Sequence, residues 1–407
     1  MSHGSYQQIL PMDYGLKTKD SFNQTMKHIT TICRILVGLL FIFSGLIKLN
    51  DPLGFSYKLE EYFEVFHITF FNSFSVAIAI ILCALEVILG IALLFGVKIK
   101  AVSWGLLILI IFFSFLTFYS AYFDVVKTCG CFGDAIPLTP WQSFSKDLIL
   151  LILIIIIIIF FNQDKIKPVF GNLGSIIVII TACLLGFGTG IYAYRNLPFL
   201  DFLPYKIGNN IPSLMKVPAG AQPDVYKVVY TLKNKKTGEL KEIDDKAYIS
   251  SKIYENPDWE YVKASDPVLV KKGYTPPIRD LKISDNDGND VTSMLLENPD
   301  YSFWIVENDL PKTNKKVQEQ LNKITLMGEE FHIRTIGLTS ASPLDAETFR
   351  HEVNAYYEFF FADAVPLKSM VRANPGLLLL KNGVVINKWH ANNLPTIDEL
   401  KKNYLNK

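Results

Sequence analysis

Two cysteines separated by a single glycine are the residues whose type and spacing most clearly allow chemistry. They are Cys129 and Cys131, in the run Cys-Gly-Cys-Phe-Gly at 129–133. A disulfide between them would close a very small ring, and strained disulfides exchange readily with other thiols. Gly130 supplies the backbone freedom that such a ring needs. The pair therefore suits thiol–disulfide exchange. One alternative is a structural disulfide that only fixes the loop. Another, with less support, is half of a zinc site.

Charged residues inside apolar segments are the second set of candidates: Arg34, Lys48 and Glu86. A charge within a bilayer is costly and usually faces a partner, the interior of a helix bundle or water. We predict that Glu86 and Arg34 tune the cysteine pair or relay protons, and structural ion pairing or snorkelling is the alternative. The other cysteines are expected to be inert apolar residues: Cys33, Cys83 and Cys183.

Five long apolar segments must position these residues, since a helix of about 20 residues crosses a bilayer. They are residues 31–49, 73–96, 101–122, 146–161 and 173–194. Short loops rich in lysine precede the first segment, join the second to the third and follow the fourth. Because such loops stay in the cytoplasm, we expect a multi-pass protein of the cell inner membrane with a cytoplasmic N-terminus. The cysteine loop and the C-terminal domain are then periplasmic, where disulfides persist.

Composition excludes several classes of protein. Half of the 407 residues are hydrophobic and the net charge is only +1, which gives no reason to expect nucleic acid as a partner. All five cysteines lie in the apolar half, unlike the pattern of a secreted disulfide scaffold. Residues 285–290 begin like a calcium loop, but its twelfth position is Leu296, so we interpret them as a β-turn. No metal is predicted.

The membrane half resembles the DoxX/MauE family of membrane proteins over roughly residues 30–165. The matching features are Arg-Ile-Leu-Val-Gly at 34–38, the run at 43–52, Glu86, the cysteine motif, and Asp147 at the opening of the fourth helix. The resemblance implies a four-helix bundle. MauE-like members are associated with periplasmic disulfide chemistry during methylamine dehydrogenase maturation, and DoxX with a quinone-linked thiosulfate-oxidising complex. The chain also resembles two-part DoxX-family proteins of Bacteroidetes, whose linker is similar to residues 201–212.

The C-terminal half is predicted to be a soluble α/β domain. Its expected elements are a strand at 225–233 followed by a turn at 236–238, a hairpin at 278–292, a strand at 301–307, a helix at 312–328, a strand at 331–338, a helix at 344–354, a hairpin of 376–380 with 384–389, and a helix from Thr396. Over 276–405 this order resembles the thioredoxin fold, with an opening like that of peroxiredoxin-like or TlpA-like members. Asn374-Pro375 stands where that fold places its cis-proline loop.

The thioredoxin-like part departs from its family where the Cys-x-x-Cys belongs. Residues 307–312 read Glu-Asn-Asp-Leu-Pro-Lys and contain no thiol. Without one, dithiol exchange by this domain is chemically impossible. We therefore interpret it as a degenerate thioredoxin fold that binds a substrate protein or covers the membrane site.

The predicted architecture is a membrane all-α helical bundle, four DoxX/MauE-like helices plus a fifth span, followed by an α/β thioredoxin-like soluble domain. The predicted domains are a cytoplasmic N-terminal segment (1–30), a DoxX/MauE-like membrane domain (31–165), a fifth transmembrane helix (166–194), a linker (195–223), a small β-rich extracytoplasmic segment (224–275) and the degenerate thioredoxin-like domain (276–407).

The predicted function is that of a membrane thiol–disulfide oxidoreductase component acting through Cys129 and Cys131. Its expected partners are the lipid bilayer and a periplasmic thiol protein, and the family resemblance implies a quinone as cofactor. The alternative is a non-enzymatic membrane anchor that carries a periplasmic protein-binding module. Serine replacement of the two cysteines discriminates between these functions.

Overall fold

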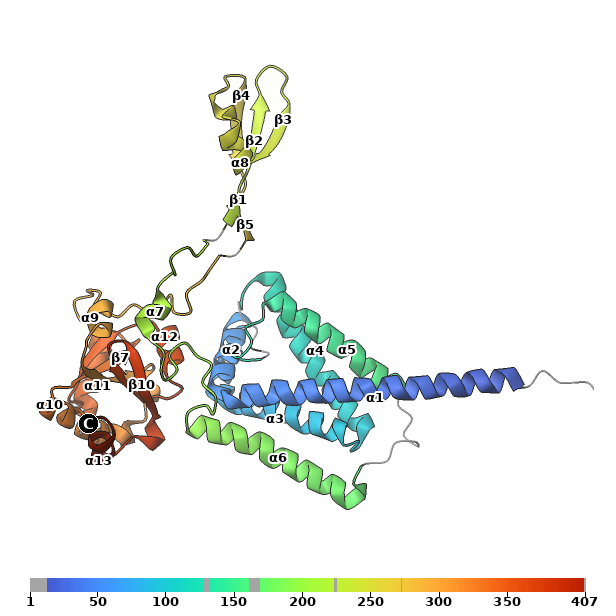
Figure 1. Cartoon of the computed structure of the whole chain (residues 1–407), viewed down its shortest axis with the longest axis horizontal. Helices are drawn as coiled ribbons and strands as arrows, with labels where there is room; N and C mark the ends of the chain where they lie inside the picture. Colours follow the sequence, from blue (N-terminus) through green and yellow to red (C-terminus); the bar gives the residue numbers. More distant parts are fainter. Residues whose placement is uncertain are drawn as a thin grey trace, which may run out of the picture.

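The computed structural model describes residues 13–126, 130, 132–160, 169–222, 225–271 and 273–405, with side chains from residue 24 onward. A bundle of long helices and a C-terminal α/β domain lie side by side, and a small β unit projects from the α/β domain (Figure 1). The C-terminal domain lies next to the end of the bundle that carries α2 (Pro52–Val65). We call this end the domain-facing end.

Five helices among the described residues are long and apolar enough to cross a membrane, which confirms the predicted number of spans. They are α1 (Asp13–Asn50), α3 (Ser75–Leu94) with the preceding turn η1 (Thr69–Phe74), α4 (Ile99–Phe123), α5 (Pro140–Phe160) and α6 (Gly171–Arg195). The predicted opening of the fourth helix at Asp147 is wrong, because α5 begins at Pro140. Apolar side chains also cover the outside of the bundle, as a lipid environment requires, with Ile108 67% and Leu184 70% exposed.

Glycines allow the first two spans to approach closely. A Cβ atom placed on Gly45 of α1 would lie 2.7 Å from Val87 Cγ2 and 2.8 Å from the Cys83 carbonyl oxygen of α3. A Cβ atom on Gly90 of α3 would lie 2.9 Å from the Gly38 carbonyl oxygen. Small residues of this kind are typical of helix contacts in membranes, where close van der Waals packing replaces the hydrophobic effect.

Helix α2 was not predicted. Its start has a local cause: the Asp51 carboxylate accepts a hydrogen bond of 2.9 Å from the Gly54 backbone N–H, and Pro52 occupies the first turn. Its inner face is anchored by Phe55 and Leu59, which are buried in the core of the bundle. The segment between the first two spans is therefore an ordered layer over the domain-facing end rather than a loop.

The C-terminal domain is built on a five-stranded sheet with the strand order β10-β9-β6-β7-β8. Strands β6 (Tyr301–Glu307), β7 (Arg334–Thr339) and β8 (Glu358–Phe361) are parallel, whereas β9 (Gly376–Lys381) runs antiparallel to both β6 and β10 (Val384–His390). This arrangement is thioredoxin-like, as predicted. The Asn374–Pro375 peptide before β9 is cis, at the predicted position.

Helices cover both faces of this sheet, which explains why β6 is apolar at successive positions. Phe303 and Ile305 pack on one face with α10 (Gln318–Glu330) and α11 (Pro343–Val353). Trp304 and Val306 pack on the other face with α12 (Ala364–Met370). Since successive side chains of a strand point to opposite faces, a strand buried on both sides loses the polar alternation of an exposed sheet.

Some predicted elements differ from the structure. The strand predicted at 225–233 is divided: β1 (Val225–Lys227) pairs with β5 (Val268–Lys271), and β2 (Val229–Asn234) lies between β3 (Leu240–Asp244) and β4 (Trp259–Ala264). The helix predicted from residue 312 begins at Gln318, after two short 3₁₀ turns. Strand β8 and helix α12 were missed.

The hairpin predicted at 278–292 is wrong. Ser284 forms isolated bridges with Asp290 and with Phe361 of β8 instead of a ladder. The predicted turn is present, because the Asp285 carboxylate accepts hydrogen bonds from the backbone N–H groups of Asp287 (3.0 Å) and Asn289 (2.8 Å). This segment is therefore a loop closed by a side-chain turn.

The connector from α6 to the C-terminal domain, residues 196–211, is hydrogen-bonded to the bundle and to the domain. On the bundle side, the Asn50 side chain exchanges hydrogen bonds of 2.8 and 2.9 Å with the backbone of Leu200. On the domain side, the Val385 N–H donates to Asn209 (3.0 Å) and the Ile211 N–H donates to Gly383 (2.8 Å). The connector is thus fixed along the edge of β10.

Candidate functional site

The loop between α4 and α5 lies at the domain-facing end of the bundle. Cys129 and Cys131 are outside the described residues, but Gly130, which joins them in the sequence, is described and has a φ of +68°. A Cβ atom on Gly130 would lie 3.4 Å from Lys58 Cγ and 3.7 Å from Phe55 Cδ2, so its backbone rests against α2. The Gly130 carbonyl accepts a hydrogen bond of 3.0 Å from the Gly133 N–H. Both the positive φ and the turn favour glycine at the centre of the motif.

Phe132, the next described residue of the motif, covers a charged pair in the second turn of α5. Its ring lies 5.6 Å from that of Phe43 and 5.1 Å from Lys146 Nζ. The Lys146 ammonium lies 2.7 Å from Asp147 Oδ1, and the Thr117 hydroxyl donates to Asp147 Oδ2 at 3.1 Å. Since Asp147 is only 1% exposed, this carboxylate needs both partners.

A second buried ion pair, Lys48 with Glu86, joins α1 to α3. The two residues are 3% and 1% exposed. Lys48 Nζ also lies 4.6 Å from the ring centre of Phe113. Glu86 Oε2 is buried without a hydrogen-bond partner among the described residues. A charged pair in this position is expensive to bury, which makes it a candidate for function rather than for stability alone.

The two ion pairs line one small cavity beneath Phe132. Its volume is about 20 Å³, and Ser44 contributes a hydroxyl to its wall. A cavity of this size holds about one water molecule, which needs polar partners of the kind found here. The structure therefore brings Glu86 together with Lys48, Lys146 and Asp147 next to the cysteine loop.

Arg34, the other predicted relay residue, lies elsewhere. Its guanidinium donates a hydrogen bond of 3.1 Å to the carbonyl of Leu94, the last residue of α3. Glu86 lies eight residues earlier on the same helix, which is about 12 Å along the helix axis. The structure thus separates Arg34 from Glu86. Sequence reasoning named Lys48 but could not assign its partner.

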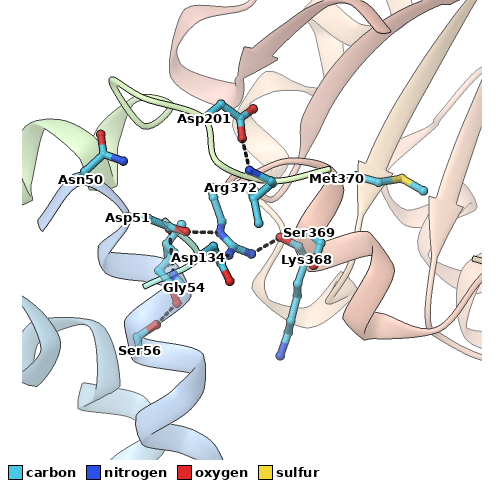
Figure 2. Close-up of polar contacts among 12 residues, drawn as sticks. Asn50, Asp51, Gly54, Ser56, Asp134, Asp201, Lys368, Ser369, Met370 and Arg372 are labelled. Carbon is cyan, nitrogen blue, oxygen red and sulfur yellow. Dashed lines mark hydrogen bonds and ion pairs between the residues drawn. The ribbon is translucent and has the colours of Figure 1, made fainter. Parts of the chain in front are cut away.

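The C-terminal domain adds Arg372 to this end of the bundle (Figure 2). Arg372 Nε donates to Asp51 Oδ2 at 2.8 Å, and Nη2 donates to Asp134 Oδ2 at 3.0 Å. Nη1 donates to the carbonyl of Lys368 on α12. Asp51 caps α2 and Asp134 belongs to the loop of the cysteine motif, so one side chain connects the domain to both.

Arg372 and Asp134 shift each other's pKa values. Burial lowers the pKa of Arg372, but the carboxylates of Asp51 and Asp134 raise it by more. Burial also raises the pKa of Asp134 against the opposing effect of Arg372. A further ion pair joins Lys388 of β10 to Asp201 of the connector. Arg372 therefore holds the domain against the bundle, and Lys388 holds it against the connector.

The loop that replaces the Cys-x-x-Cys, residues 307–312, faces the bundle across a cleft of about 530 Å³. Asp309 and Asn374 line one wall, and Tyr57 and Glu60 of α2 line the other. The loop is bonded to the cis-proline segment, since the Asn374 amide donates to the Asp309 carbonyl at 2.6 Å. The face that carries the dithiol in thioredoxins is thus turned toward the membrane half.

Behind this loop lies a buried acid that the sequence analysis did not single out. Glu307, the last residue of β6, is fully buried, and burial raises its pKa to about 8. The Tyr357 hydroxyl donates to Glu307 Oε2 at 3.3 Å and lies 3.2 Å from Gln318 Oε1. No cluster of three or more metal-binding side chains occurs among the described residues.

Comparisons with known proteins give a family model, a relative and a solved structure to which the chain is similar. Residues 26–160 match the family model "Methylamine utilisation protein MauE". The chain is 31% identical over 121 residues to "Protein TlpB" of Flavobacterium psychrophilum, which covers 28% of this chain and 32% of that relative. It is similar to the solution structure of a putative protein disulfide isomerase from Bacteroides thetaiotaomicron, with 17% identity, a TM-score of 0.25, and coverage of 30% of this chain and 80% of that one.

The match over residues 26–160 confirms the predicted resemblance to the MauE family for the membrane half of this multi-pass membrane protein. The chain spans about a third of the length of the curated relative that it matches. The thioredoxin-like assignment of the C-terminal domain rests on its strand order and cis-proline position.

Proposed function

We propose that this protein is a thiol–disulfide exchange component of the inner membrane, in which Cys129 and Cys131 react with a thiol protein in the periplasm. The observation that carries the proposal is the placement of Gly130. This residue rests on α2 and shares a cleft with a thioredoxin-like domain that has no cysteine of its own, and Phe132, two residues further on, lines the cavity of the buried ion pairs. The matches to MauE and to the relative TlpB support the same class of function.

The proposed reaction transfers one disulfide bond between two pairs of cysteines. A partner thiolate attacks one sulfur of the Cys129–Cys131 disulfide, the S–S bond breaks, and a mixed disulfide forms. The second partner thiol then displaces the remaining cysteine, so the partner leaves oxidised and the pair is left as two thiols. Two electrons and two protons pass from the partner to the pair. The reverse reaction oxidises the pair again with a partner disulfide.

The buried charges beneath the loop suit proton handling in this reaction. Attack requires a thiolate, so each turnover releases or takes up protons near the sulfur atoms. Asp147 and Glu86 line the cavity under Phe132, within the reach of a single water molecule. In this proposal the two carboxylates hold those protons, and Arg34 takes no part.

A quinone does not fit the cavity between these charges. The cavity of about 20 Å³ is far smaller than pockets for small molecules, which measure roughly 300–1,000 Å³. The quinone therefore stays a prediction of the family resemblance, and no step is derived through it.

A protein-binding scaffold is the second candidate, and the degenerate loop at 307–312 favours it. In that function the MauE-family domain only anchors the thioredoxin-like module. The cysteines would then contribute to stability alone.

Thiol trapping on intact cells tests the proposal. A membrane-impermeant maleimide should label the protein only after mild reduction, and the double variant Cys129→Ser/Cys131→Ser should not label. Each single serine variant should label without reductant, because its remaining thiol has no disulfide partner. Cys183→Ser, in α6, serves as the control and should behave like the unmodified protein. Absence of labelling after reduction would contradict the proposal, provided that a cysteine introduced at exposed Ser250 does label.

A further inference from the structure

A cleft runs between α2, the cysteine loop and the C-terminal domain. Its volume is about 390 Å³. One wall is formed by α2, the second by Gly130 and residues from 133 to 138, and the third by α12 with Arg372. Gly130, which joins the two cysteines in the sequence, is part of the lining. A molecule in this cleft would therefore touch the motif that the proposed function uses.

The walls of the cleft are made by two different halves of the chain, and Arg372 holds them together. Its contacts with Asp51 and Asp134 cross the cleft at one end. Next to them, Lys368 Nζ lies 4.4 Å from the ring centre of Tyr57. The thioredoxin-like domain thus contributes a wall that is bonded to the membrane half, and it does so without any thiol.

The charge of the lining is negative. Five carboxylates, Asp51, Glu60, Glu61, Glu64 and Asp134, face three cations, Lys58, Lys368 and Arg372, which leaves a balance of 3 − 5 = −2. Arg372 is already committed to two of these carboxylates, and Lys58 is paired with Glu61 at 2.6 Å.

Glu60 and Glu64 stand one helical turn apart on α2, and Glu64 is exposed. A row of this kind along one wall attracts cations and repels anions such as lipid phosphates. Apolar side chains complete the opening of the cleft. Val365 of α12 is 70% exposed and Ile136 of the loop is 41% exposed. An extended polypeptide segment can place cationic side chains against the carboxylates and apolar side chains against Val365 and Ile136. Successive side chains of such a segment point in opposite directions, so one segment can contact both kinds of lining.

Resting on the proposed function, we infer that this cleft binds a cationic, extended segment of the partner protein and delivers the cysteine of that segment to Cys129 and Cys131. In this arrangement the thioredoxin-like domain is a docking wall rather than a redox module. The loop at 307–312, where thioredoxins carry their dithiol, lines the other cleft of about 530 Å³ and not this one, so the domain needs no thiol to act as this wall.

The test uses the full chain in detergent as the Cys131→Ser variant, which leaves Cys129 as the attacking thiol. The probes are two short peptides with one cysteine activated as a pyridyl disulfide, one flanked by lysines and one by glutamates, and a small uncharged pyridyl disulfide. In each reaction the Cys129 thiolate attacks the probe sulfur, a mixed disulfide forms, and pyridine-2-thione leaves and is followed by its absorbance.

At low salt the lysine peptide should react about 10-fold or more faster than the glutamate peptide, and the difference should shrink as salt is raised. The triple variant Glu60→Gln/Glu61→Gln/Glu64→Gln should abolish this preference when the rate of each peptide is divided by that of the uncharged probe on the same variant. The matched control, Glu239→Gln/Glu242→Gln/Glu255→Gln in the projecting β unit, removes the same charge away from the cleft and should keep the preference.

The outcomes separate the two proposals. Equal rates for the two peptides, or a preference that survives the triple substitution, would overturn the docking inference while the proposed function stands. Failure of even the uncharged probe to react would instead contradict the proposed function, because Cys129 would then be inaccessible to any disulfide.

Discussion

Replacement of the buried acid Glu307 by glutamine should change how the stability of the C-terminal domain depends on pH. Glu307 is fully buried, and its Oε1 atom has no hydrogen-bond partner among the described residues. Burial raises its pKa from 4.5 to about 8. The folded chain therefore keeps this carboxyl protonated up to about pH 8, whereas the unfolded chain loses the proton near pH 4.5.

The sign and size of the effect follow from this difference. Between these two pH values the folded state binds one proton more than the unfolded state, so the free energy of unfolding falls as pH rises. One pH unit corresponds to about 1.4 kcal/mol, and 8 − 4.5 = 3.5 units give a total loss of about 5 kcal/mol. The contribution of Glu307 is complete below pH 4.5 and lost as pH passes 8. Glutamine does not titrate, so Glu307→Gln should remove this loss.

Urea unfolding of the full chain in detergent, followed by tryptophan fluorescence, measures this difference. Trp304 is fully buried on the same strand and should report the unfolding of the domain. The variant and the unmodified protein should have similar midpoints at pH 5, and the variant should be more stable by several kcal/mol at pH 8.5. Glu319→Gln, at an exposed position of α10, is the control and should keep the original pH dependence. An equal decline in both proteins between pH 5 and 8.5 would refute the reasoning.

Two further predictions concern the membrane half. Lys48→Met leaves Glu86 as an unpaired buried charge and should lower stability by about 3–5 kcal/mol, whereas the double variant Lys48→Met/Glu86→Gln should recover most of it. Thermal unfolding in detergent measures both, and a double variant as unstable as the single one would contradict the pairing. Gly45→Ala forces α1 away from α3 and should cost about 1–3 kcal/mol in the same assay. The matched control Gly188→Ala places its methyl group in open space, so equal effects of the two substitutions would argue against close packing at Gly45.

Features set by local sequence were predictable. The five spans follow from long apolar runs, and β6 and the β9–β10 hairpin follow from apolar runs bounded by turn residues. Helix α2 carried a local signal as well, since Asp51-Pro52 is a typical helix start. That signal was assigned only to the family motif, so the helix was missed.

Features set by distant partners were not predictable. Strand β8 has only four residues and is stabilised by parallel pairing with β7, which no local pattern reveals. The division between β1 and β2 depends on which strands they pair with.

The ion pairs of the candidate site could not be predicted for the same reason. Arg372 and Asp51 are 321 residues apart, and Lys48 and Glu86 are 38 apart. Residue types identified Arg34, Lys48 and Glu86 as costly charges in a membrane, but only tertiary packing decides which of them meet. Arg372 gave no signal at all, because a single arginine in a soluble domain is ordinary until it is buried.

The fixed connector between α6 and the C-terminal domain has a consequence for how strongly a partner must bind. A flexible tether of this length would let the domain sample a large volume, and the local concentration of anything it carried would be correspondingly diluted. Here the hydrogen bonds of Asn50 and of the β10 edge remove that freedom in advance. If the domain binds a polypeptide as proposed, that polypeptide meets the membrane half at an effective concentration of about millimolar or more. Weak, rapidly reversible binding is then sufficient, and a product can leave as quickly as the next partner arrives.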